Sequence, residues 1–145
     1  MSTHQRRGVA LLLALLALVL IGALVSATLF RVQSDARLAR DAMARRRAEA
    51  GAERMIRITL ATTSSATMRA LPIGAGTTST DLTNGVTTVV TVVRTDSVLA
   101  WIDATASAPS VRGSARARLG ASASIAPMGS ASLQLLPGDA WAQVY

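Results

Sequence analysis

The side chains that carry out acid–base or nucleophilic chemistry are few in this sequence and far apart. Its one histidine is His4, and it has no cysteine, which removes thiolate catalysis and histidine- or cysteine-based metal clusters. The eight carboxylates are dispersed over 145 residues. Only Glu49 and Glu53 share a helix face, with arginines at ion-pairing spacing around them. We therefore expect solvated ion pairs, no cofactor, no metal and no enzymatic activity.

The charge of the chain is strongly basic, at +7, and all 15 basic residues are arginine. Such a charge is compatible with nucleic acid or an anionic membrane surface. Aromatic residues, which stack on bases, make up only 3% of the sequence, and no nucleic-acid-binding motif occurs. We interpret the arginine usage as a trace of genomic base composition and expect no nucleic-acid partner.

The elements that position these residues begin with a long apolar run. Residues 1–8 are polar and basic, and residues 9–30 contain no charged side chain. As a helix, these 22 residues would span roughly 33 Å, enough for the hydrocarbon core of a bilayer. The alternative is the buried helix of a soluble protein, but the rest of the chain has too little large apolar surface to surround it. Residues 9–30 are therefore predicted to span a membrane.

The helical pattern continues through residues 31–60, which contain no proline and are rich in alanine, arginine and glutamate. One continuous helix of about fifty residues is expected, apolar in its first half and amphipathic in its second. Its narrow apolar stripe is typical of a helix lying on a flat surface. The stripe comprises Leu38, Ala42, Ala48, Ala52, Met55 and Ile56.

A small sheet is predicted beyond the helix. Residues 61–85 are rich in Thr, Ser and Gly and indicate a loop, and residues 86–125 indicate three antiparallel strands with turns at 95–97 and 108–110. The third strand places mostly alanine on its inner face, so the sheet needs a covering layer. We expect the 31–60 helix to pack on the face carrying the valines, Trp101 and Leu119, giving an α+β fold. The tail, 126–145, adds a strand or caps the sheet.

Two segments of this pattern resemble the type IV pilin-like proteins. One is QRRGVALLLALLALVL, residues 5–20, and the other is AEAGAE, residues 48–53. Within that class the chain is most similar to PilX-type minor pilins and to the K-type minor pseudopilins of type II secretion. The resemblance covers the first 60 residues, and the β-region matches in kind without a diagnostic motif.

The resemblance implies a processing and assembly route. A prepilin peptidase would remove residues 1–8 by cutting after Gly8 and would methylate the new amine of Val9, and the mature helix would pack with those of other pilin or pseudopilin subunits. Most pilins have glutamate at the fifth mature position, whereas this chain has Leu13. Family members without that glutamate tend to be tip or priming components, which implies a minor subunit in the inner membrane with its C-terminal domain outside the cytoplasm. Glu49, Gly51 and Glu53 belong, with Leu13, to the implied assembly helix.

Two alternatives remain open at this point. Residues 6–27 also fit a secretory signal peptide cut near Thr28, which would leave a soluble exported domain. A generic single-pass membrane protein is the other, because six arginines between residues 31 and 47 outnumber Arg6 and Arg7 and favour a cytoplasmic C-terminus. The sequence does not distinguish a type IV pilus from a secretion pseudopilus or a competence pilus.

Overall fold

The computed structural model describes residues 3–126, 132–136 and 141–143, and it describes the side chains of residues 11–126 and 132–136. The chain divides into two compact units, Met1–Ala39 and Arg40–Tyr145. Each unit is treated by itself below.

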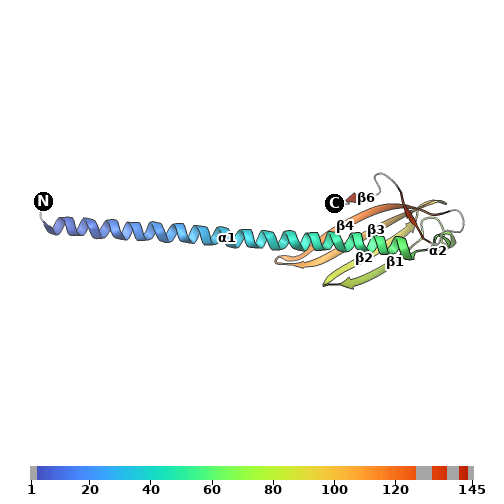
Figure 1. Ribbon diagram of the computed structural model, residues 1–145, viewed down its shortest axis with the longest axis horizontal. Coiled ribbons are helices and arrows are strands. Elements are labelled where there is room, and N and C mark those ends of the chain that lie inside the picture. Colours follow the sequence, from blue (N-terminus) through green and yellow to red (C-terminus); the bar gives the residue numbers. More distant parts are fainter. Residues whose placement is uncertain (1–2, 127–131, 137–140, 144–145) are drawn as a thin grey trace. The chain divides into compact units, whose positions relative to one another are not determined.

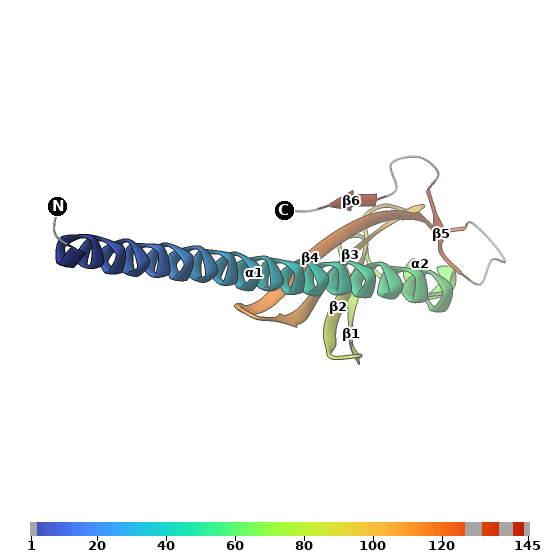
Figure 2. The same cartoon turned by 60° about the vertical axis from the view of Figure 1, so that its left-hand side comes forward.

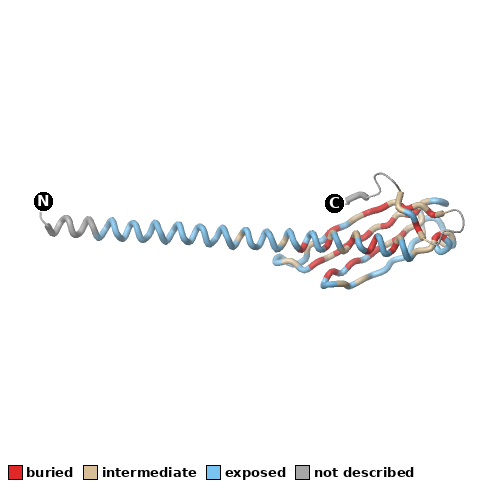
Figure 3. Tube along the Cα trace, in the orientation of Figure 1, coloured by how far each residue is buried: buried red, intermediate tan, exposed pale blue. Residues whose placement is uncertain are grey.

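A single helix, α1 (Thr3–Thr62), makes up the described part of the first unit and enters the second (Figure 1). The predicted continuous helix over residues 9–60 is thus confirmed. Every residue from Leu11 to Gln33 is exposed, which the uninterrupted pale blue of this stretch shows in Figure 3. Exposing so many leucines to water is unfavourable, so this surface is compatible with an apolar environment such as a membrane.

An antiparallel sheet and the last third of α1 form the second unit (Figure 2). Four strands follow one another as a meander: β1 (Gly76–Thr83), β2 (Val86–Arg94), β3 (Leu99–Ser110) and β4 (Gly113–Ser124). Two short segments, β5 (Gln134–Leu135) and β6 (Trp141–Gln143), both pair with β4. The predicted α+β class and meander are therefore confirmed, with additional strands.

The core lies between α1 and one face of the sheet. The burial of β2 and β3 alternates strictly over most of their length, which is the pattern of strands covered on one face. The register places Val92 beside Ile102 and Ile102 beside Ala121, so the buried residues of β2, β3 and β4 share that covered face. The buried residues of α1 recur at three- and four-residue steps. They are Ala44, Ala48, Ala52, Met55, Ile56 and Thr59.

The predicted loop over residues 61–85 is wrong, because this segment holds a short helix, α2 (Ser65–Ala70), and all of β1. Ser64 caps α2, its hydroxyl accepting a hydrogen bond of 3.0 Å from the Thr67 N–H. The Thr-rich run before Asn84 favours a strand through its β-branched side chains, although its polarity is typical of a loop. The strand is polar because β1 is the outermost strand and is largely exposed.

The predicted turn at residues 108–110 is also wrong, since β3 continues to Ser110 and the turn is formed by Val111 and Arg112. Proline lacks the N–H that a central strand needs. The pairing of β2 with β3, however, ends at Ser107, so Pro109 has a neighbouring strand on one side only. A proline is tolerated at such a position.

Two packing predictions need correction. Leu38 is 59% exposed and Ala42 is exposed, so the buried stripe of α1 starts later than predicted, at Ala44. Trp101 has the opposite parity in β3 to the buried Ile102, so it lies on the sheet face away from α1. There its ring covers Gly120, where an added Cβ would overlap the indole.

The C-terminal tail adds strand pairing along the free edge of β4, in the form of β5 and β6, and Leu133 joins the core. The tail was expected to add a strand or to cap the sheet, and each expectation holds in part. The remaining tail residues, 127–131, 137–140 and 144–145, lie outside the described structure.

Candidate functional site

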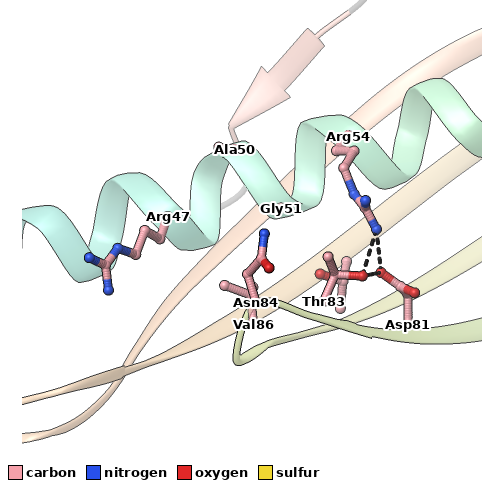
Figure 4. Close-up of a pocket in the computed structure, with 9 residues that line it drawn as sticks. Arg47, Ala50, Gly51, Arg54, Asp81, Thr83, Asn84 and Val86 are labelled. Carbon is pink, nitrogen blue, oxygen red and sulfur yellow. Dashed lines mark hydrogen bonds and ion pairs between the residues drawn. The ribbon is translucent and has the colours of Figure 1, made fainter.

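A hollow of about 360 Å³ lies between α1 and the β1–β2 hairpin. Its helix side includes two small residues, Ala50 and Gly51, beside two arginines. Figure 4 shows Arg54 reaching from α1 toward the hairpin, while Asn84 points up toward the helix. The hollow is lined by Arg47, Ala50, Gly51, Arg54, Asp81, Thr83, Asn84, Val86 and Thr88.

A closed set of hydrogen bonds joins α1 to β1 at this hollow. The Arg54 Nη2 donates to Asp81 Oδ2 at 2.6 Å and to Thr83 Oγ1 at 2.8 Å, and the Thr83 hydroxyl donates to the same Asp81 oxygen at 2.7 Å. The bond from Thr83, and also the contact with the Arg54 guanidinium, lower the pKa of Asp81 below its usual 3.8, against the opposing effect of burial. Asp81 is therefore a fixed anion at neutral pH.

These hydrogen bonds suit a structural clasp between α1 and β1 better than a catalytic site. Arg54 and Asp81 already satisfy each other, and general acid–base catalysis at neutral pH needs a group that titrates near the working pH. Within the described stretches no three Asp, Glu, His or Cys side chains gather where a metal ion could bind.

The sequence did not reveal the Arg54–Asp81–Thr83 set. Arg54 was grouped with the arginines around Glu49 and Glu53, and Asp81 with the dispersed carboxylates. Arg54 and Asp81 lie 27 positions apart, and the sequence between them carries no signal that links them. The only hint was Asn84-Gly85, whose turn signal fixes a hairpin and so pairs β1 with β2 at the edge of the sheet.

The residues implied in assembly lie in different surroundings. Leu13 is 60% exposed in the first unit. Glu49 pairs with Arg45 (3.3 Å between Oε1 and Nε), and Glu53 pairs with Arg57, each one helical turn away. The expectation of solvated ion pairs around the two glutamates is confirmed.

Gly51 faces the sheet of its own chain. A Cβ added there would lie 2.9 Å from Cγ1 of Val86 and 3.3 Å from Oγ1 of Thr88. The absence of a side chain thus permits the close approach of α1 to β2. This glycine therefore has a packing function within the chain.

Gly8 and Val9 belong to the helical backbone of α1, but their side chains are outside the described set. The structure therefore leaves the expected processing site as a prediction.

The first unit provides the apolar surface of the chain. α1 is the one described helix long and apolar enough to cross a membrane, with a mean hydropathy of 2.7 over its best window, none of which is buried. A signal sequence near the N-terminus would pass the same test. The chain is thus compatible with a single-pass membrane protein.

No known protein family, curated protein or solved structure matches this chain. The structure is an α+β domain with α1 in its core. The N-terminal part of the same helix is long, apolar and exposed.

Proposed function

We propose that this chain is a minor pilin or pseudopilin, a subunit that primes or caps a type IV pilus or a type II secretion pseudopilus. The observation that carries the proposal is that the two ends of α1 have different surroundings. From Leu11 to Gln33 every residue is exposed, whereas Ala48, Ala52 and Ile56 are completely buried against the chain's own sheet. A helix that anchors at one end and forms the domain core at the other suits a subunit that is held in the membrane before assembly.

Leu13 supports the minor role. A glutamate within the hydrocarbon region is costly unless a partner neutralises it, and pairing with a neighbour's terminal amine would provide that. Leu13 carries no such charge, so it can neither make nor need this contact. A subunit of this kind fits a position at the end of the helical stack, where fewer neighbours must be matched.

The test is the intact mass of the protein extracted from membranes of a host that has a prepilin peptidase. We expect a chain that begins at Val9 and carries one added methyl group. Gly8→Leu should leave the precursor uncut, because a bulky side chain prevents close approach of the backbone to the peptidase. Gly22→Leu is the matched control, since nothing lies within 4 Å of that position and processing should continue. A mature N-terminus near Thr28 would establish a secreted domain instead.

A specific observation favours a second candidate, a single-pass protein with a cytoplasmic domain. Six arginines follow the apolar run between residues 31 and 47, against Arg6 and Arg7 before it. The processing experiment separates the two when the C-terminus also carries a reporter active only after export. An active reporter on a chain starting at Val9 supports the pilin proposal, and an uncut chain with an inactive reporter supports the cytoplasmic one.

A further inference from the structure

The two hairpin turns of two residues each, between β1 and β2 and between β3 and β4, are built from very different residues. Asn84 and Gly85, between β1 and β2, have positive φ angles of 53° and 73°, which a two-residue turn with the natural strand twist requires. Val111 and Arg112, between β3 and β4, are a β-branched and a long basic residue, and the positive φ falls on Gly113 instead. Turn chemistry does not explain a valine at this tip.

The tip of the β3–β4 hairpin is held against the start of the α1 segment in the second unit. The Val111 N–H donates to Oδ1 of Asp41 at 3.2 Å, and Arg112 Nε lies 3.8 Å from the other oxygen of that carboxylate. Beside this contact is a hollow of about 290 Å³. It is lined by Arg40, Met43, Ala44, Arg47, Pro109, Ser110 and Val111.

The surface around this hollow combines exposed apolar and basic side chains. Met43 is 59% and Val111 is 51% exposed. Asp41 pairs with Arg112. Arg40 and Arg47 take part in none of the ion pairs found among the described residues, so their charges are not offset by such a pair. We call these five residues, Arg40, Met43, Arg47, Val111 and Arg112, the tip patch.

We propose that the tip patch binds the headgroups of an anionic phospholipid bilayer. Arginine offers a planar fork of donors to phosphate oxygens, and apolar side chains between basic ones suit the boundary of headgroups and acyl chains. The inference rests on the membrane anchor of the proposed function. Arg40 lies ten positions after Phe30, the end of the uncharged run, which is a helical length of about 15 Å. The anchor therefore keeps the patch within reach of the bilayer.

The experiment uses the full chain in lipid nanodiscs. Because the sequence has no cysteine, Ser114→Cys puts a single fluorophore beside the tip, and Ser97→Cys, in the exposed turn between β2 and β3, gives a matched remote probe. The measurement is quenching by acrylamide, a neutral water-soluble quencher. In discs of equal phosphatidylcholine and phosphatidylglycerol we expect the label at position 114 to be shielded relative to pure phosphatidylcholine, with no change at position 97. High salt should abolish the difference.

Arginine variants identify the residues responsible. Arg47→Gln should lower the ratio of shielded to free tips about fivefold, the effect of one basic side chain near an anionic surface. Arg116→Gln, an exposed arginine on the other face of the sheet, should leave the ratio unchanged. Val111→Ser should weaken the shielding without removing its dependence on salt.

Several outcomes would overturn the proposal. Equal quenching in both kinds of disc excludes the lipid headgroups, and shielding that follows protein concentration instead of lipid charge assigns the patch to a second copy. If inorganic phosphate in phosphatidylcholine discs shields the label as strongly as anionic lipid does, the patch is a site for free anions. A chain that does not enter discs at all would refute the membrane anchor itself, which distinguishes failure of the proposed function from failure of this inference.

Discussion

Replacing Ile56 by alanine tests whether the helix and the sheet share one core. Ile56 is completely buried on the face of α1 that packs on the sheet, whereas Ile58, two residues on, is 40% exposed. The same substitution at both positions gives the same change in helix propensity, about half a kcal/mol in favour of alanine. Any difference between them therefore reports the packing against the strands.

The expected magnitude follows from the burial. Truncating a fully buried isoleucine removes its transfer free energy and leaves a cavity, which together cost about 3 kcal/mol. For a domain of about a hundred residues this lowers Tm by roughly 10–20 °C. Ile58→Ala should change the free energy of unfolding by no more than about 0.5 kcal/mol.

The assay is thermal unfolding of the full chain in detergent micelles, followed by tryptophan fluorescence. Trp101 and Trp141 belong to β3 and β6, and α1 contains no tryptophan, so the signal reports the sheet alone. Equal Tm values for the Ile56 and Ile58 variants would show that α1 does not pack on the sheet. The shared core would then be wrong, even with the membrane anchor intact.

Two further predictions concern the other side of the sheet and its edge. Gly120→Val should push the indole of Trp101 away from β4, because a Cβ at that position would overlap the ring, and we expect a red shift of tryptophan emission with a lower Tm. Gly22→Val serves as the control, since nothing lies within 4 Å of that glycine. Asp81 has its folded pKa below the usual 3.8, so its contribution to stability is present above about pH 4 and is lost as the pH falls through the folded value. Asp81→Asn should therefore flatten the dependence of Tm on pH below about 4, and an unchanged profile would show that the Arg54 clasp does not stabilise the fold.

The sequence predicted the elements with strong periodicity. The uncharged run and its amphipathic continuation identified α1 almost to its last turn. The β-branched run at Val86–Arg94 identified β2 with the same bounds as in the structure. Such patterns are reliable because burial on one face imposes a period on the residues themselves.

What the sequence did not predict depends on contacts between distant segments. β1 is polar because its side chains are largely exposed on both faces, so its pattern is that of a loop. In β3 both faces carry apolar residues, Ile102 on one and Trp101 on the other, and the indole lies over Gly120 of the neighbouring strand, a contact that the sequence does not reveal. The clasp between Arg54 and Asp81 likewise depends on the fold and has no local signature.

The way α1 is used constrains how it can contact other subunits. The alanine-rich face of the second half of α1, from Ala44 to Ile56, packs on the sheet of the same chain. Gly51 lets the helix backbone lie close to Val86. A neighbouring helix can then meet only the remaining faces, which carry Glu49 and Glu53 in ion pairs within α1. Exposed pairs of this kind contribute only about 0.3–0.5 kcal/mol, so both glutamates can exchange an internal arginine for one on another subunit at little cost. In the proposed assembly the core of this domain would therefore stay closed, and its charged helix surface would be the part that selects a partner.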